Sequence, residues 1–374
     1  MRMDQSRIIV KIGTSTLTGG SSRLHLPQIV GLAQQIASLS EKGHQVVLVS
    51  SGAIAVGKES LGFPELPKSI PGKQMLAAVG QPRLMNVYES IFGIFGKKVA
   101  QVLLTREDIS DRKRYLNARN TLESLLTHGV TPIVNENDTV ATEEIRIGDN
   151  DNLSAMVANL VEADLLVLLT DQEGLFTADP KKDPNAALIH EISGPEISQE
   201  IWMYAGGTDG ELGTGGMLTK LQAAEVARKT GTRVVIADGR KQNILMEIVQ
   251  GERVGTSILP TVDKMESRKR FLLAGINTEA SIIVDMGAAE AICQGGSLLP
   301  VGIVGVRGNF ERGDIVKIEN EKGNDRALGL ADYSSDEIKL IKGKKSSEIE
   351  KILGYAFGDE IVHHNNMAIT GSTS

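Results

Sequence analysis

Short and almost continuous apolar stretches recur along the first two thirds of the chain, and no other feature constrains its fold as strongly. They are rich in Val, Ile and Leu, as in parallel strands that helices cover on both faces. The stretches lie at 7–12, 45–50, 99–105, 131–134, 164–171 and 232–238. Segments with apolar residues at helical spacing separate several of them, at 27–42, 72–92, 115–127 and 153–161. The alternation predicts a doubly wound α/β domain with a mainly parallel sheet.

Four of the predicted strands end in small or polar residues, at 13–15, 50–52, 135–138 and 170–171. Ligands of open α/β sheets bind outside the carboxyl ends of the strands, so these four ends are expected to form one shared site. Lys11 interrupts the first apolar stretch at its end. It is either an edge-strand lysine whose ammonium reaches water, or a fixed ammonium at the ligand-binding edge. Gly13, Thr14 and Ser15 offer backbone N–H groups beside it and favour the second interpretation.

The densest run of Asn and acidic residues lies between a predicted strand and a predicted helix, and reads V-N-E-N-D-T-V-A-T-E-E-I-R-I-G-D-N-D-N at 134–152. Asn side chains donate and accept hydrogen bonds, whereas ionised Asp side chains only accept them. Such a segment suits a small ligand that carries both ammonium and carboxylate groups, or a metal ion. The alternative is a solvated turn with Asx caps, which Asn and Asp also favour. Spacing alone does not separate the two.

A glycine-rich segment, G-E-L-G-T-G-G-M-L-T-K at 210–220, precedes a predicted helix that runs through Ala227. Glycines before a helix can bring backbone N–H groups to an anion, and Lys220 would lie one turn inside the helix. The segment is not a Walker A loop, because G-x-x-x-x-G-K-[ST] is absent. A flexible glycine hinge is the alternative. A further segment at 174–180 is expected to form a hairpin excursion.

Composition narrows the classes of partner and compartment. The 374 residues carry a net charge of -7, which argues against nucleic acid as the main partner. The single cysteine, Cys293, excludes an intrachain disulfide and a multi-cysteine metal site. The longest apolar run, 165–169, is far too short to cross a bilayer, and the first residues lead straight into a strand pattern without a signal peptide. We therefore expect a cytoplasmic protein.

The strand–helix pattern weakens at 251–270, and a different pattern follows it. Short strands separated by glycine turns predict a small β-rich module, with short helices at 335–340 and 347–353. The strands are expected at 281–285, 303–306, 314–318 and 327–330. The tail at 363–374 shows no clear pattern, and His363 and His364 are more consistent with solvated side chains than with a metal site. We predict a first domain at 1–262, a linker at 263–278, a second domain at 279–356 and a tail at 357–374.

Several motifs stand in a characteristic order along nearly the whole chain. The first part contains V-K-I-G-T-S at 10–15, V-S-S-G-A-I-A at 49–55, K-Q-M-L-A-A-V-G-Q at 73–81, N-E-N-D at 135–138, G-D-N-D-N-L-S-A at 148–155, L-L-T-D-Q-E-G-L-F-T-A-D-P at 168–180 and G-T-G-G-M-L-T-K at 213–220. The second part contains S-L-L-P-V-G-I at 297–303 and I-L-G-Y at 352–355. In this order and spacing, the chain resembles the glutamate 5-kinases, a branch of the amino acid kinase family that carries a C-terminal PUA domain.

The resemblance implies phosphoryl transfer from ATP, with Mg²⁺, to the γ-carboxylate of L-glutamate, as the first step of proline synthesis. It also implies feedback inhibition by proline and a homo-oligomer, either a dimer or a tetramer. By resemblance, the catalytic residues are Lys11, Lys220 and Asp151, and Asp151 orients the two lysines. The substrate-binding residues implied are Ser51, Gly52, Asn135, Asp138 and Asn150. The ATP-binding residues implied are Lys11, Gly13, Thr170, Asp171, Thr214, Gly215, Gly216, Met217, Leu218, Thr219 and Lys220, and no residue is implied as a metal ligand.

Two departures from the family pattern concern the nucleotide segment. Leu218 stands where a small polar residue is more usual, and 204–211 looks slightly expanded, so nucleotide affinity could differ. Two alternative functions stay open. One is an amino acid kinase with aspartate or N-acetylglutamate as acceptor, and the other is RNA binding through the PUA domain. Residues 279–356 hold ten Lys and Arg against thirteen Asp and Glu, and this net charge of -3 disfavours RNA. We place the action of proline on the loop at 136–150, because that loop is long and polar.

Overall fold

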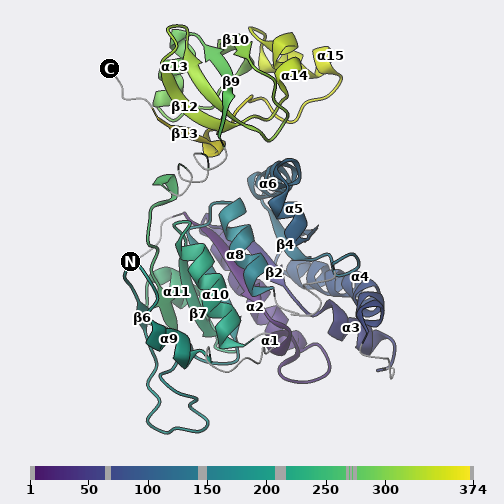
Figure 1. The fold of residues 1–374 in the computed structure, drawn as a ribbon. Coiled ribbons are helices and arrows are strands. Elements are labelled where there is room, and N and C mark those ends of the chain that lie inside the picture. Colours follow the sequence, from purple (N-terminus) through teal and green to yellow (C-terminus); the bar gives the residue numbers. More distant parts are fainter. Residues whose placement is uncertain are drawn as a thin grey trace. The chain divides into compact units, whose positions relative to one another are not determined.

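The computed structural model describes residues 5–63, 69–141, 150–206, 216–266, 269, 272 and 276–370. The chain forms two compact units (Figure 1). One unit comprises Met1–Ser110 and Ala118–Val262, and the other comprises Asp111–Asn117 and Asp263–Ser374. The first unit carries the predicted site residues, so its architecture is given first.

A sheet of eight strands runs through the described part of the first unit, in the order β3-β4-β2-β1-β5-β7-β8-β6. The first six strands in this order, β3 through β7, are parallel to one another. Among the described strands, the one antiparallel pair of this sheet is β7 with β8. This topology confirms the predicted doubly wound, mainly parallel α/β fold. The strands are β1 (Arg7–Ile12), β2 (Gln45–Ser50), β3 (Lys98–Leu104), β4 (Val130–Glu136), β5 (Leu165–Thr170), β6 (Glu191–Ile192), β7 (Arg233–Asp238) and β8 (Thr256–Ile258).

Helices cover both faces of this sheet, and Figure 1 shows α8 and α10 side by side on one of them. The helices of the first unit include α1 (Thr14–Thr18), α2 (Leu26–Glu41), α3 (Ala53–Ser60), α4 (Ile70–Ile94), α5 (Arg106–Ser110), α6 (Arg112–Thr127), α8 (Asp151–Leu160), α9 (Gln199–Tyr204), α10 (Met217–Arg228) and α11 (Ile244–Gln250). Helix α6 begins in Asp111–Asn117 and so spans both units. Among the residues that the structure describes, no helix combines the length and apolar character that a bilayer crossing requires.

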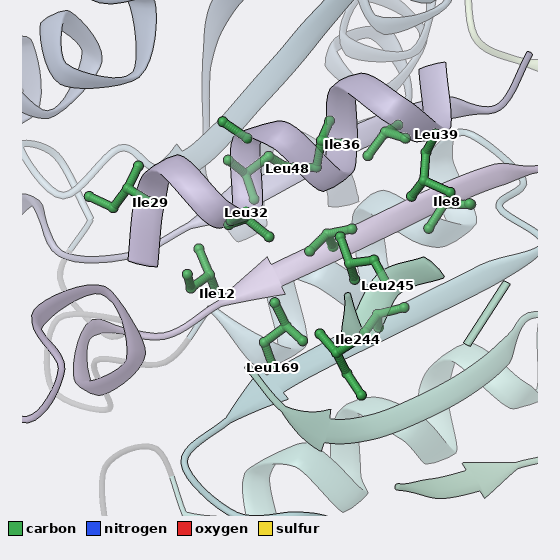
Figure 2. Packing of buried hydrophobic residues seen from close by; sticks show 14 of the residues in the cluster. Ile8, Ile12, Ile29, Leu32, Ile36, Leu39, Leu48, Leu169, Ile244 and Leu245 are labelled. Carbon is green, nitrogen blue, oxygen red and sulfur yellow. The ribbon is translucent and has the colours of Figure 1, made fainter. Parts of the chain in front are cut away.

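Helix α2 forms the core of the opposite face by burying one apolar stripe. Its residues Ile29, Leu32, Ile36 and Leu39 recur at the three- and four-residue spacing that places side chains on one side of a helix. The stripe packs on the sheet and on α11 (Figure 2), through Ile8, Ile12, Leu48, Leu169, Ile244 and Leu245. Full burial of such a side chain contributes about 1.5–3 kcal/mol. Because strand side chains alternate, the packing of Ile8 and Ile12 under α2 turns Lys11 to the face that α8 covers.

Several short elements differ from the sequence-based expectations. The turn expected after β1 is the single-turn helix α1, and the short elements β6, β8, α9 and α11 were not predicted. Elements of two to seven residues carry too few positions to show a periodicity. The expected excursion after β5 is present, because Phe176 and Leu188 form an antiparallel bridge. Its base is held by Thr256, whose hydroxyl accepts from the Leu175 N–H at 2.8 Å.

The second unit is a small β-rich structure, as predicted. Its five strands in the described residues have the order β10-β9-β11-β12-β13. They are β9 (Ile276–Val284), β10 (Ile303–Arg307), β11 (Ile315–Asn320), β12 (Asp325–Leu330) and β13 (Met367–Ile369), with helices α13 (Met286–Cys293), α14 (Ser335–Ile341) and α15 (Ile349–Leu353). The tail showed no clear pattern in the sequence, but β13 pairs antiparallel with β12 there. Three residues are too few for a recognisable alternation, and pairing alone defines this strand.

Candidate active site

Three buried charged side chains meet at the carboxyl end of the parallel strands. Lys11 comes from β1, Asp151 is the first residue of α8, and Lys220 lies in the first turn of α10. Lys11 Nζ is 2.5 Å from Asp151 Oδ1, and Lys220 Nζ is 3.1 Å from Asp151 Oδ2. The three residues are 3%, 0% and 5% exposed. The structure therefore brings together the three residues that the sequence predicted as catalytic.

The local fold explains why these side chains converge. Strand β1 lies between β2 and β5 in the middle of the sheet, so Lys11 is not an edge-strand lysine. Asp151 occupies the first turn of α8, where the helix dipole stabilises a carboxylate. Thr219 adds a hydroxyl that lies 3.0 Å from Asp151 Oδ2 and 2.8 Å from the Gly216 carbonyl, so it can donate to either. The Asp151 carboxylate is thus the centre of the cluster.

The cluster formed by Lys11, Asp151 and Lys220 carries two ammonium groups and one carboxylate, hence a formal charge of +1. Buried charge is costly unless an opposite charge meets it. An anionic group between the two ammonium groups would balance the cluster. Phosphoryl groups are anions of this kind, and reactions that transfer them depend mostly on positioning and neutralisation of charge.

A cavity of about 500 Å³ borders the second half of the site. All five predicted substrate-binding residues line it, namely Ser51, Gly52, Asn135, Asp138 and Asn150. Asn135 and Asn150 are 2% and 7% exposed, so the solvated-turn interpretation is wrong for these two positions. The rest of the Asn-rich run includes 142–149, and this segment, with Glu143 in it, lies outside the described residues. The structure brings the five residues together, and their roles stay predictions.

Buried amide groups connect this cavity to the sheet and to α4. Asn150 Nδ2 donates to the Ser50 carbonyl and to Asn135 Oδ1, each at 2.7 Å. Asn135 Nδ2 donates to Gln81 Oε1 at 2.8 Å. The Glu136 N–H donates to Asn135 Oδ1 at 2.9 Å. The ends of β2 and β4 are therefore tied to the start of α8 and to α4 through side-chain amides.

Asp138 is one of two acidic residues that line the cavity, the other being Glu136, and its surroundings change its proton affinity. Burial raises the pKa of Asp138 to about 6, and the positive charge of Lys73 limits the increase. At neutral pH the carboxylate is still ionised, but it is held in a place that disfavours its charge. A ligand ammonium at this position would offset that cost.

Two glycines allow α3 to lie where its first residues line the cavity. A Cβ atom on Gly80 would lie 1.8 Å from the Ala53 carbonyl oxygen, and one on Gly57 would lie 1.9 Å from the Leu76 carbonyl oxygen. Helices α3 and α4 therefore cross at backbone contact. Gly52, directly before α3, has a φ of 99°, a conformation that favours glycine. The turn at Ser51 and Gly52 is thereby held at the edge of the cavity.

The predicted nucleotide-binding residues are only partly within the described structure. Thr170 is buried at the end of β5, and Asp171 is exposed directly after it. Gly216, Met217 and Leu218 are at least partly exposed at the start of α10, and Thr219 and Lys220, the next two residues of the same turn, are buried. Thr214 and Gly215 lie outside the described residues, as does 207–211 of the segment that looked expanded. The glycine-hinge alternative is therefore not tested.

Comparison with known proteins adds a decisive observation. The model of the amino acid kinase family matches residues 6–238, and the model of the PUA domain matches residues 280–353. The chain belongs to the amino acid kinase family. Among its relatives there, proteins named "Glutamate 5-kinase" are 51% identical in Shewanella amazonensis and 52% identical in Herpetosiphon aurantiacus. The matches cover 97% and 96% of this chain, and 96% and 97% of those relatives. A third, from Aliivibrio fischeri, is 50% identical over 99% of this chain and all of its own length.

The family assignment agrees with the resemblance seen in the motifs, so that prediction is confirmed. Some residues around the site were nevertheless missed. Gln81 and Lys73 lie on α4, and Lys58 lies on α3. No pattern in the sequence indicates that they border Asn135, Asp138 or the cavity. Gln81 and Lys73 belong to the motif at 73–81, which was noted only as part of the resemblance. Arg240 was also missed, and its guanidinium donates to the Asp171 carbonyl at 2.6 Å.

The side chains that could coordinate a metal ion indicate how a kinase of this family would bind Mg²⁺. Within the described residues, no three His, Cys, Asp or Glu side chains are grouped so that they could hold a metal ion. Mg²⁺ commonly keeps several waters and is bound mainly through substrate phosphates, with one or two carboxylates. Asp171, an exposed member of the predicted ATP-binding residues, is a carboxylate of this kind. The residues present fit an ion that arrives with the nucleotide.

Proposed function

We propose that this protein is a glutamate 5-kinase. It transfers the γ-phosphoryl group of ATP to the γ-carboxylate of L-glutamate and forms L-glutamyl 5-phosphate, the first step of proline biosynthesis. The observation that carries the proposal is the buried cluster of Lys11, Asp151 and Lys220 beside a cavity lined by Asn135, Asp138 and Asn150. The full-length similarity to proteins with this name supports the choice of acceptor.

In the proposed reaction, a γ-carboxylate oxygen of glutamate attacks the γ-phosphorus of ATP, and the bond from that phosphorus to ADP breaks. Lys11 and Lys220 neutralise the charge on the transferring group, and Asp151 holds both ammonium groups in place. The attacking carboxylate is ionised at neutral pH, so no general base is required. Backbone N–H groups near Gly13 and Gly52 are proposed to hold phosphoryl oxygens. When bound, Mg²⁺ supplies further charge neutralisation on the phosphates.

The proposed substrate contacts follow from the charges around the cavity. Asp138 would meet the α-ammonium of glutamate, and the amides near Ser51 would donate to a carboxylate. An acetylated amine has no ammonium to offer, so an ionised Asp138 would reject N-acetylglutamate. Thr170, Asp171 and the segment 214–220 are proposed to bind ATP. This arrangement favours glutamate over N-acetylglutamate, and the similarity to proteins named "Glutamate 5-kinase" favours glutamate over aspartate.

The remaining proposals concern the whole protein. We propose a kinase domain at 1–262 and a PUA domain at 279–356, joined by a linker at 263–278 and followed by a tail at 357–374. We also propose that the protein acts in the cytoplasm as a homo-oligomer, either a dimer or a tetramer. These proposals rest on the family resemblance, and on composition for the compartment.

Proline is proposed as a feedback inhibitor that acts at or over the glutamate site, on the loop at 136–150. Substitution of Asp138 or Glu143 is then expected to change proline sensitivity and the glutamate KM together. Initial rates over a matrix of glutamate and proline concentrations measure both. If the KM changes while inhibition stays as in the wild type, the two ligands do not share this loop.

The acceptor specificity tests the proposed function. ATP consumption is measured with L-glutamate, D-glutamate, L-aspartate and N-acetyl-L-glutamate, with hydroxylamine present to trap an acyl phosphate as a hydroxamate. We expect hydroxamate from L-glutamate and little from the others. Turnover with acetylglutamate instead would keep the fold and overturn the assignment of Asp138. Turnover with aspartate instead would keep the fold and overturn the choice of acceptor. Absence of turnover with every acceptor would direct attention to the PUA domain and RNA.

A further inference from the structure

The orientation of the amide network around the cavity is fixed by two backbone groups. The Ser50 carbonyl can only accept, so the atom of Asn150 that lies 2.7 Å from it must be Nδ2. The Glu136 N–H can only donate, so the atom of Asn135 that lies 2.9 Å from it must be Oδ1. Side-chain amides are otherwise easily misassigned by a flip of oxygen and nitrogen. Here the backbone removes that ambiguity.

The same orientation decides what Asn150 can offer a ligand. Its Nδ2 has two hydrogens, and the Ser50 carbonyl and Asn135 Oδ1 accept one each. The group that remains for a ligand in the cavity is the carbonyl oxygen Oδ1. Asn150 and Asp138 therefore both present acceptors to the cavity. Two acceptors suit an ammonium group and do not suit a carboxylate.

Asn135 lies between Asn150 and Gln81 in this network. Its Oδ1 accepts from Asn150 and from the Glu136 N–H, so its Nδ2 must find an acceptor elsewhere. Gln81 Oε1 is that acceptor, at 2.8 Å. Without Gln81, a buried N–H would lose its partner, and rotation of Asn135 to satisfy it would break the bond to Asn150.

The burial and hydrogen bonding of Gln81 are consistent with a residue whose role is to hold Asn135. It is only 8% exposed on α4, where a polar amide is costly to bury. Its Nε2 has no hydrogen-bond partner among the described residues, and Gln81 lines a smaller cavity of about 230 Å³ that Asp138 also lines. A core position on this helix would be more stable with an apolar residue. The amide is therefore explained by its contact with Asn135 rather than by packing.

We propose that Gln81 is a positioning residue for recognition of the amino acid: by holding Asn135, it keeps the Asn150 carbonyl oxygen directed at the α-ammonium of the substrate. The inference rests on the proposed function, since it assumes that an α-amino acid fills the cavity. Gln81 does not line the larger cavity, in which the substrate is proposed to bind. It acts on the substrate indirectly, because it holds Asn135, and Asn135 in turn holds Asn150.

The test compares glutamate with glutarate, which has both carboxylates but no ammonium. In Gln81→Met, which keeps the approximate volume but removes the acceptor, we expect the glutamate KM to rise about tenfold or more, the effect of leaving a buried amide unsatisfied. The inhibition constant of glutarate against glutamate and the ATP KM are expected to change less than about twofold, because neither depends on the ammonium contact. Gln81→Glu retains an acceptor oxygen and should keep the glutamate KM closer to the wild-type value.

Leu84→Ala is the matched control. Leu84 is buried on the same helix, three residues further, and lines neither cavity, so its truncation should lower the melting temperature without changing either constant. Three results would overturn the inference while leaving the proposed function intact: an unchanged glutamate KM in Gln81→Met, an equal loss of glutarate binding, or the same KM change in Leu84→Ala. A wild-type protein that does not phosphorylate glutamate would overturn the proposed function and this inference with it.

Discussion

The raised pKa of Asp138 leads to a prediction in which stability and activity move in opposite directions. The pKa of this carboxyl rises from 3.8 to about 6 in the folded protein. At about 1.36 kcal/mol for each tenfold change in proton affinity, ionised Asp138 costs the folded state up to about 3 kcal/mol. Between these two pKa values the folded protein binds more protons than the unfolded chain. Protonation of Asp138 therefore favours the folded state. This stabilisation is fully present below pH 3.8 and is lost as the pH rises through about 6.

Asp138→Asn removes the charge and with it this cost. Without ligand, the variant is expected to be more stable than the wild type at pH 7.5, by about 1–3 kcal/mol, and the difference should shrink towards pH 4. Its glutamate KM should rise by about 10- to 100-fold, because a charge-assisted contact with the α-ammonium contributes about 1.5–3 kcal/mol. Below pH 6, the glutamate KM of the wild type should increase about tenfold for each decrease of one pH unit, and the KM of the variant should lack this dependence.

Two measurements check the reasoning. Thermal unfolding without ligand, at pH 5 and pH 7.5, gives the stability difference, and initial-rate kinetics over the same pH range give the glutamate KM. Lower stability of Asp138→Asn at pH 7.5 would refute the burial argument. An unchanged KM, or a KM with the wild-type pH dependence, would refute the assignment of Asp138 to the ammonium.

Three further predictions follow from the site and its supports. Asp151→Asn leaves two buried ammonium groups without their shared carboxylate, which costs about 3–5 kcal/mol. The kcat of this variant should therefore fall at least about 100-fold. A kcat within about threefold of wild type would show that Asp151 does not organise the lysines. Gly80→Ala would place a Cβ atom 1.8 Å from the Ala53 carbonyl oxygen and should prevent soluble expression or sharply lower the melting temperature. Gly93→Ala, on the same helix with open space around it, should be neutral or slightly stabilising, and equal behaviour of the two variants would contradict the close helix crossing. The acidic balance of 279–356 predicts no RNA binding even at low salt, and salt-sensitive binding in a fluorescence anisotropy titration would contradict this.

The sequence was sufficient for the parts of the fold that repeat. Parallel strands end at one edge of their sheet, so polar residues after β1, β2, β4 and β5 had to lie near one another. The convergence of Lys11, Asp151 and Lys220 required more than this, because Lys220 lies on α10, and only the resemblance placed it opposite Lys11. The β-rich character of the second unit was likewise visible in its short strands and glycine turns.

Other features depend on contacts between residues far apart in the chain. Gln81 is 54 residues from Asn135, and no local pattern marks its amide as part of the site. The close crossing at Gly57 and Gly80 requires two glycines on different helices, and each looks like a poor helix residue when read alone. Strand β13 has too few residues to show a period and is defined only by its pairing with β12. Tertiary contacts decide all three.

Transfer of an oxygen isotope tests the central claim most directly. Glutamate labelled with ¹⁸O in both oxygens of its γ-carboxylate is incubated with ATP and the protein, and hydroxylamine then cleaves the acyl phosphate at its carbonyl carbon. If a γ-carboxylate oxygen attacks phosphorus between Lys11 and Lys220, each phosphate released should carry one ¹⁸O, visible as an isotope shift in the ³¹P spectrum. Phosphate without ¹⁸O would mean that water attacks ATP, and it would contradict the proposed kinase reaction.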